Sequence, residues 1–292
     1  MTAKVERPAL RWHGGKWRLA PWIIAHFPAH RIYVEPFGGA ASVLLRKSRS
    51  YAEVYNDIDD DVVNLMRVLQ DRSNAAELRR RLDLTPFARR EFEDAWGTSS
   101  DPIERARFLI IRSFMGFGSH AHSDPRHGHR TTGFRANSNK SGTTPAQDWV
   151  NYPDALPAVV DRLGGVIIEH RPAQQVMLAH DGPDTLHYVD PPYLPETRGL
   201  GNPHDPKHRY RHDMTVGDHV ALLSLLRELV GMVVLSGYPA GLYDDALGGW
   251  RRVERDALAD GARPRVEVLW INPRCAAALD RQQVPLLHEA AT

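Results

Sequence analysis

The order of apolar and polar positions predicts strands that alternate with helices in the first part of the chain. A short apolar run, Ile32 to Val34, enters a glycine turn and then a stretch of small and apolar residues, the pattern of a strand, a turn and a helix. The pattern repeats with a strand from Ala52 to Tyr55 and a helix from Asp60 to Gln70, and a helix-like stretch, Leu19 to Phe27, precedes both. Two consecutive strand-helix units predict a parallel sheet with helices on its faces.

The pattern changes between Thr85 and Pro157. An expected helix, Ile103 to Ser113, leads into a stretch of about 30 residues rich in Gly, Ser, Thr, Asn, His and Arg. Connections of that length are usually functional or disordered. We therefore predict that residues 85–157 form an insertion in a catalytic domain made of residues 1–84 and 158–292.

Sheet-like apolar segments resume after the insertion, and an amphipathic helix is expected from Asp218 to Val230. The expected strands are Val166 to Glu169, Leu186 to Asp190, Met232 to Ser236 and Val266 to Ile271. The predicted fold class is α/β, a sheet interrupted by a basic insertion.

Composition excludes several classes of protein. With 292 residues, of which 42% are hydrophobic and 25% charged, the chain can bury the core of one large domain or of a domain with an insertion. No apolar run reaches the roughly 18 to 20 residues of a membrane span, and the N-terminus is polar, so we expect a cytoplasmic protein without membrane contact. The single cysteine, Cys275, excludes an internal disulfide and argues against a cysteine-based zinc site.

Positive charge is concentrated in the insertion although the net charge of the chain is only +1. Between Arg105 and Lys140 there are six arginines and one lysine against one acid, Asp124. Such a local field suits the phosphate backbone of DNA, and the residues that lie among turn-forming neighbours are the candidate contacts: Arg126, Arg130, Arg135 and Lys140. The histidines from His120 to His129 allow a zinc site, but a solvated loop near phosphates is favoured, and we expect no metal.

The segment Glu35-Pro36-Phe37-Gly38-Gly39 follows the first strand. Its two glycines remove side chains where the chain turns into a helix, so a ligand can approach the backbone and the helix N-terminus. About 18 residues after Gly39, Asp57 ends the next strand, where an acid typically accepts hydrogen bonds from the ribose of an adenosine-containing ligand. Asp57 can alternatively cap the following helix.

Asp190-Pro191-Pro192-Tyr193 is the most informative segment. A strand that ends in an acid and two prolines presents a carboxylate and unpaired carbonyl groups at the rim of the sheet, because proline has no N–H to pair. Such a rim can accept hydrogen bonds from an exocyclic amine, and Tyr193 offers a flat face for a planar base. The alternative is a rigid turn without function.

Several segments, in this order, resemble the alpha group of adenine-N6 DNA methyltransferases, the Dam-like family. They are Arg11-Trp12-His13-Gly14-Gly15-Lys16, Glu35 to Val43, Tyr55 to Asp59 and Asp190 to Tyr193, followed by Ser236-Gly237-Tyr238 and Glu267 to Asn272. The resemblance implies a Rossmann-like methyltransferase fold that binds S-adenosylmethionine, with a target-recognition region in the insertion. His13 and the looser turn Gly38 to Ser42 depart from the family pattern.

The resemblance also implies roles for individual residues. Trp12 and Lys16 would contact the methionine end of the cofactor, Glu35 to Gly39 would pass beneath it, and Asp57 would hold the ribose. Asp190 to Tyr193 would form the catalytic pocket, with Asp190 also near the cofactor. The expected substrate is an adenine flipped out of double-stranded DNA. No obligate protein partner is evident.

Other substrates remain open at this stage: adenine in RNA, the N4 amine of cytosine and a protein glutamine amide all present a planar amine or amide. A catalytically inactive DNA-binding homologue is a further alternative. The basic insertion favours nucleic acid over protein as the substrate. A tyrosine at position 193, rather than a tryptophan, favours adenine over the N4 amine of cytosine. A chain without an evident nuclease suggests an orphan or phage-type modification enzyme that protects DNA from restriction or marks it.

Overall fold

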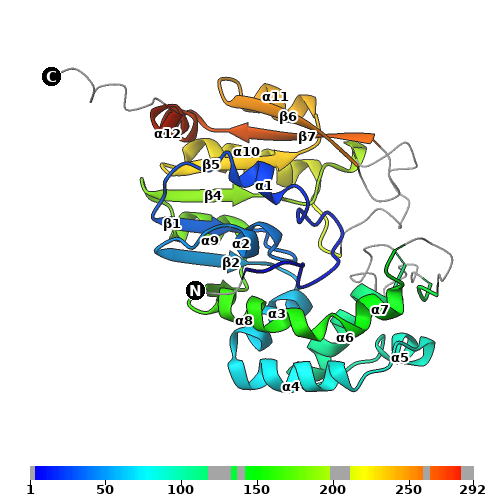
Figure 1. The fold of residues 1–292 in the computed structure, drawn as a ribbon. Coiled ribbons are helices and arrows are strands. Elements are labelled where there is room, and N and C mark those ends of the chain that lie inside the picture. The colour runs from blue at the N-terminus through cyan, green and yellow to red at the C-terminus, as the bar shows by residue number, and fades with distance from the viewer. Residues whose placement is uncertain (1–3, 118–132, 137–141, 198–210, 259–263, 284–292) are drawn as a thin grey trace.

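A seven-stranded sheet runs through the molecule in the order β3-β2-β1-β4-β5-β7-β6 (Figure 1). The computed structural model describes residues 4–117, 133–136, 142–197, 211–258 and 264–283. The first five strands pair in parallel, whereas β7 is antiparallel to both β5 and β6. The strands are β1 (Ile32–Glu35), β2 (Ala52–Asn56), β3 (Ile167–Glu169), β4 (Thr185–Val189), β5 (Met232–Gly237), β6 (Arg251–Leu258) and β7 (Pro264–Ile271).

The apolar pattern explains which strands are central. Every residue of β4 and β5 is buried, as expected for strands of a parallel sheet that is covered on both faces. By contrast, β6 carries the exposed charged residues Arg251, Arg252, Glu254 and Arg255, and it pairs with β7 alone. Its composition is typical of an edge strand. The sequence analysis did not predict β6.

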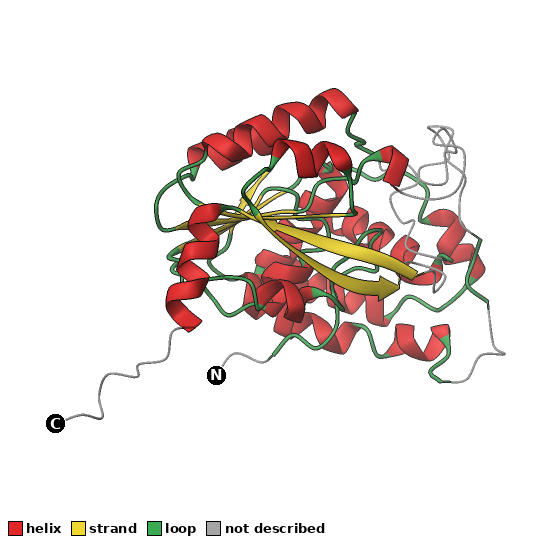
Figure 2. Cartoon of the chain, turned by 90° about the horizontal axis from the view of Figure 1, so that it is seen from above, coloured by secondary structure: helices red, strands yellow, loops and turns green. Residues whose placement is uncertain are grey.

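Helices cover both faces of the sheet (Figure 2). They are α1 (Ala20–Ile24), α2 (Ser42–Arg46), α3 (Asp60–Gln70), α4 (Arg72–Asp83), α5 (Arg89–Asp94), α6 (Pro102–Met115), α7 (Pro145–Val150), α8 (Leu156–Leu163), α9 (Ala173–Ala179), α10 (Val216–Glu228), α11 (Gly241–Ala246) and α12 (Pro273–Gln283). The expected α/β Rossmann-like sheet is thus confirmed. Among the described residues, no helix is both long and apolar enough to cross a membrane.

The described part of residues 85–157 packs onto the helices beside the sheet. Leu109 and Ile110 of α6 and Trp149 of α7 share one hydrophobic cluster with Leu65 and Met66 of α3. The indole N–H of Trp149 donates to the carbonyl of Thr85 at 2.7 Å. The first and last parts of the expected insertion thus contact each other, and both pack in the same hydrophobic cluster as α3.

Candidate active site

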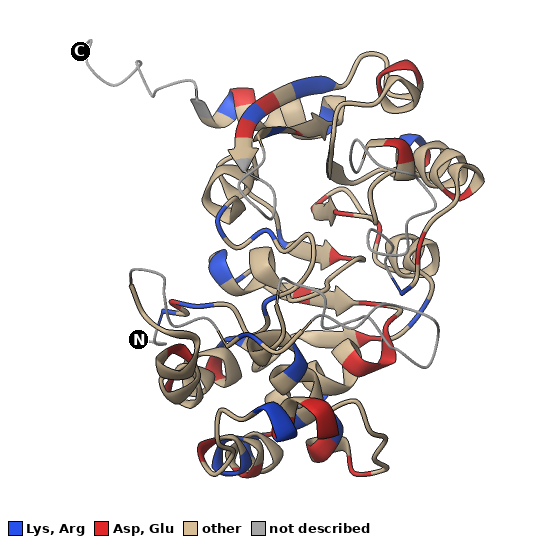
Figure 3. Ribbon diagram, turned by 90° about the vertical axis from the view of Figure 1, so that its right-hand side faces the viewer, with Lys and Arg blue, Asp and Glu red and all other residues tan. Residues whose placement is uncertain are grey.

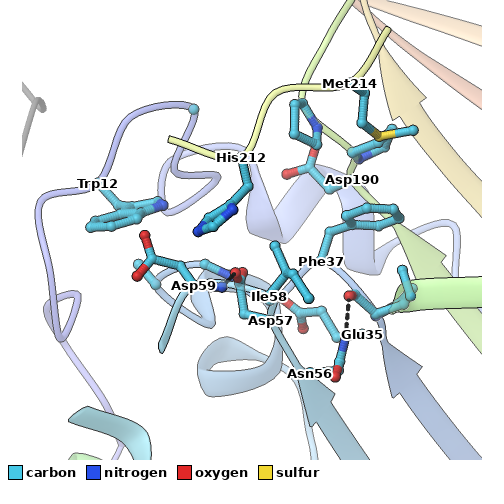
Figure 4. Close-up of a pocket in the computed structure, with 18 of the residues that line it drawn as sticks. Trp12, Glu35, Phe37, Asn56, Asp57, Ile58, Asp59, Asp190, His212 and Met214 are labelled. Atoms are coloured by element: carbon cyan, nitrogen blue, oxygen red, sulfur yellow. Dashed lines mark hydrogen bonds between the residues drawn. The ribbon is translucent and has the colours of Figure 1, made fainter. Parts of the chain in front are cut away.

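A pocket of about 370 Å³ lies where β1 and β4 run side by side. The chain continues from β1 toward β2 on one side of this point and from β4 toward β5 on the other, so the two strands form the topological switch point of the sheet. Ligands of open α/β sheets bind at the carboxyl ends of the strands at such a point. In Figure 4 the side chains of Trp12, Phe37, Asp57 and Asp190 all border the pocket.

The glycine turn after β1 is shaped by aromatic rings of the chain itself. A Cβ atom on Gly38 would lie 2.1 Å from the ring of Tyr55, so that ring occupies the space a side chain would need. Gly39 has a φ of +46°, and a Cβ there would lie 3.1 Å from the indole of Trp12. The expectation that the missing side chains leave room for a ligand therefore needs correction at Gly38, where the space holds Tyr55. Both glycines still border the pocket.

Asp57 ties the glycine turn to the end of β2. Its Oδ2 accepts a hydrogen bond from the N–H of Gly39 at 2.7 Å, and its Oδ1 accepts one from the N–H of Asp59 at 2.9 Å. Burial raises the pKa of Asp57 to about 6. The helix cap of α3 is Asp59, whose side chain accepts from the N–H of Asp61, so the alternative role of Asp57 as the cap is wrong.

Glu35, the last residue of β1, is buried at the floor of the pocket. Its Oε2 accepts hydrogen bonds from the Tyr33 hydroxyl at 2.7 Å and from the N–H of Leu44 at 3.0 Å. Burial outweighs these bonds and raises the pKa of Glu35 to about 8. Burial thus favours the protonated form of this carboxyl group.

Asp190 follows β4 and borders the same pocket. Its Oδ2 lies 3.0 Å from Nζ of Lys16, and its Oδ1 accepts a hydrogen bond from the Ser236 hydroxyl at 2.7 Å. Lys16 is nearly buried, so this ion pair is shielded from water. Pro191 and Pro192, which supply no N–H, also line the pocket.

Tyr193 lies behind the pocket lining. Only 6% of the residue is exposed, and its hydroxyl donates to Oε2 of Glu267 on β7 at 2.9 Å. Nζ of Lys16 lies 4.7 Å from the centre of its ring, and the ring of Tyr238 meets it edge-on at 4.6 Å. Burial raises the pKa of Glu267. The ring that we expect to face a base thus rests against a cation and a second tyrosine.

The structure gathers most of the predicted residues around one pocket. Those that line it are Trp12, Lys16, Glu35, Pro36, Phe37, Gly38, Gly39, Asp57, Asp190, Pro191 and Pro192. Two further groups at the pocket were not predicted from the sequence: Pro172 to Gln174, which precede and begin α9, and the segment Arg211 to Met214. Ser236 and Glu267 belong to segments that carry the family resemblance, but no role was predicted for them, although both are polar residues within apolar strands.

The segment Arg211 to Met214 borders the pocket and is held by acids at the start of α3. Nη1 of Arg211 lies 3.3 Å from Asp59 and 3.1 Å from Asp61. Nothing in the local sequence around Arg211 indicated this contact, because the partners are about 150 residues away.

The arginines of α6 are paired with acids of the chain. Arg105 contacts Asp60 and Asp61, and Arg107 contacts Glu91 and Glu104. Figure 3 shows Lys and Arg interspersed with Asp and Glu on the helices at the foot of the view. Arg105 and Arg107 are therefore paired with acids within the protein, and both lie in the helix expected from Ile103 to Ser113.

Three of the four residues predicted to contact DNA lie outside the described residues. Arg126, Arg130 and Lys140 lie outside the described residues, as do the histidines from 120 to 129. Arg135 is described: it is partly buried, and its backbone N–H donates to the carbonyl of Met115 at 2.8 Å. The described residues contain no cluster of three or more metal-ligating side chains.

Cys275 is buried in α12, away from the pocket. Burial raises the pKa of its thiol to about 12. A thiol with this pKa is not a nucleophile at neutral pH.

Comparison with known proteins gives a consistent family. Residues 12–208 match the family model of the D12 class N6 adenine-specific DNA methyltransferases. The DNA adenine methylase of Serratia marcescens is 34% identical over 120 residues, which are 37% of this chain and 41% of that protein. The DNA adenine methylase of Escherichia coli K12 is 29% identical over 119 residues, 39% of this chain and 42% of that protein. The chain thus matches about two fifths of the length of these relatives.

Proposed function

Because this chain belongs to the D12 class of N6 adenine-specific DNA methyltransferases, we propose that it transfers a methyl group to the N6 amine of adenine in DNA. One observation carries the proposal within the structure. The Asp190 carboxylate and the Pro191-Pro192 backbone border the same pocket as Asp57 and the glycine turn. A group that accepts hydrogen bonds from an amine thus lies beside a site suited to an adenosine-containing cofactor.

The proposed methyl donor is S-adenosylmethionine, and the pocket fits it in size and chemistry. Its volume of about 370 Å³ falls within the roughly 300 to 1,000 Å³ of small-molecule sites. Asp57 would accept from the ribose hydroxyls, Trp12 and Lys16 would lie toward the methionine end, and Glu35 to Gly39 would form the floor. The cofactor, when bound, supplies a methyl group on a positively charged sulfur.

The residues of the chain would act on the target amine. The lone pair of an aromatic amine is delocalised into the ring, which makes the nitrogen a poor nucleophile. Hydrogen bonds from the amine to the Asp190 carboxylate and the Pro191 carbonyl favour a pyramidal nitrogen with an available lone pair. The protein also holds the reactants in line, which supplies much of the acceleration.

The target adenine would have to leave the DNA helix to reach Asp190. Flipping costs a few kcal/mol, which stacking on an aromatic ring partly offsets. Tyr193 is the candidate ring, and its present contacts with Lys16 and Tyr238 would then have to change. We propose residues 85–157 as the target-recognition region, with Arg126, Arg130, Arg135 and Lys140 as the candidate phosphate contacts, and residues 1–84 and 158–292 as the catalytic domain.

Sequencing of DNA from cells that express the protein, with a readout of modified bases, tests the proposal. We expect modified adenines within one short motif, absent from cells that express the Asp190→Ala variant. Unmodified DNA, combined with methyl transfer to RNA or to a protein amide by the purified chain, would refute it.

A further inference from the structure

Ser236 lies directly across the sheet from the proposed catalytic acid. The parallel register pairs Tyr188 with Val234 and Val189 with Leu235, so the next position of β5, Ser236, stands beside Asp190. The side chain of Ser236 is buried, with 1% of the residue exposed. Its hydroxyl donates to Oδ1 of Asp190 over 2.7 Å.

The Ser236 hydroxyl is the middle member of a chain of hydrogen bonds in which each hydroxyl donates toward Asp190. The oxygen of Tyr188 lies 3.2 Å from Oγ of Ser236. A serine hydroxyl has a single proton, which is used on Asp190, so the Tyr188 hydroxyl must be the donor to Ser236. Burial raises the pKa of Tyr188 well above its usual value, so the phenol keeps its proton and stays a donor.

The two oxygens of Asp190 therefore have different partners. Oδ1 is held by Ser236 from inside the sheet, and Oδ2 lies 3.0 Å from Nζ of Lys16, which borders the pocket. The carboxylate turns freely about its last bond unless hydrogen bonds fix its plane. A charged acceptor is held more firmly than a neutral one, because charge-assisted hydrogen bonds are shorter and stronger.

We propose that Ser236 is a positioning residue for methyl transfer. Its hydroxyl fixes the plane of the Asp190 carboxylate from the buried side and keeps Oδ2, which also pairs with Lys16, on the side of the pocket where the target amine is proposed to bind. Tyr188 supports Ser236 in this role. The inference rests on the proposed function and deepens it, because it assigns to buried hydroxyls the orientation of the acid that accepts the amine.

Three variants test the proposal in single-turnover methylation of duplex DNA at saturating DNA and cofactor. Ser236→Ala removes the donor to Asp190, and Tyr188→Phe removes only the donor to Ser236. Thr185→Val is the matched control, since it removes a buried hydroxyl of β4, the strand of Tyr188, that donates instead to the carbonyl of His180 at 2.9 Å. Rates are normalised to cofactor-binding sites counted by calorimetry, so a loss of folded protein does not affect them.

We expect Ser236→Ala to slow the rate per site by about 10- to 100-fold, the order of effect of a small misplacement of a reacting group. The KM values for DNA and cofactor, measured from steady-state rates at varied concentrations, should change less than about twofold. Tyr188→Phe should have a smaller effect on the single-turnover rate, and Thr185→Val should keep the wild-type rate. A Ser236→Ala rate per site within about twofold of wild type would overturn the inference. A wild-type protein that fails to methylate adenine would instead refute the proposed function itself.

Discussion

Oδ2 of Asp57 accepts a hydrogen bond from the N–H of Gly39 at 2.7 Å, which joins the ends of β1 and β2 at the edge of the pocket. The carboxylate thereby supports a glycine in the left-handed region and still borders the pocket. Asp57 thus has a structural partner in addition to its proposed cofactor contact.

Asp57→Ala should weaken cofactor binding by about 1 to 3 kcal/mol, because a buried hydrogen-bond partner is lost. Asp57→Asn, which keeps one acceptor oxygen for Gly39, should bind the cofactor better than Asp57→Ala. Isothermal titration calorimetry measures both. Equal affinity of Asp57→Ala and wild type would limit Asp57 to supporting the turn.

Asp190→Ala should reduce methyl transfer by about 100-fold or more, since it removes the charge on which the amine is proposed to bind. Asp190→Asn should be similarly impaired, although it keeps the size of the side chain and an oxygen for Ser236. Cofactor affinity should stay within about tenfold, or 1.4 kcal/mol, of wild type. Ordinary turnover by either variant would contradict the catalytic role of Asp190.

Gly38→Ala should destabilise the fold by about 1 to 3 kcal/mol or more, because its methyl group would enter the space of the Tyr55 ring. Gly217→Ala is the control: it lies in α10, and its added Cβ would come no closer than 3.7 Å to Thr215. The control should be neutral or slightly stabilising. Urea denaturation gives both free energies of unfolding, and equal values would show that the turn adapts without cost.

Glu35→Gln should change how stability depends on pH. The pKa of Glu35 is raised from 4.5 to about 8 in the folded protein, so the folded state keeps a proton that the unfolded chain releases. The contribution of Glu35 to the free energy of unfolding is therefore fully present below pH 4.5. It is lost as the pH rises to about 8. Glutamine cannot ionise in this range.

The free energy of unfolding of Glu35→Gln relative to wild type should therefore rise between pH 5 and pH 8, by up to about 1.4 kcal/mol per pH unit. The shifted pKa of Asp57 is common to both proteins and cancels in the difference. Urea denaturation of both proteins at several pH values measures this difference in the free energy of unfolding. Parallel stability curves would show that Glu35 is ionised throughout.

Local patterns predicted the central elements well. Apolar spacing placed α3 at Asp60–Gln70, and the runs that became β1, β2, β4 and β5 were visible because strands buried on both faces are continuously apolar. The edge strand β6 was missed because its charged residues on both faces do not alternate with apolar ones.

Contacts between distant segments could not be predicted from local pattern. The sequence predicted Asp57 and Asp190 each at the end of a strand, and the structure places both at one pocket. The hydrogen bond from Tyr193 to Glu267 joins residues 74 positions apart, and the one from Ser236 to Asp190 depends on the register of two strands. Register is a property of the assembled sheet.

Identification of the methylated nucleoside tests the central claim most directly. Purified wild-type protein and Asp190→Ala are incubated with duplex DNA and S-adenosylmethionine carrying a labelled methyl group, and the DNA is digested to nucleosides and analysed by mass spectrometry. The account predicts label in N6-methyldeoxyadenosine for the wild type and about 100-fold less, or none, for the variant. Label in N4-methyldeoxycytidine, or in no nucleoside of DNA while the protein binds the cofactor, would contradict it.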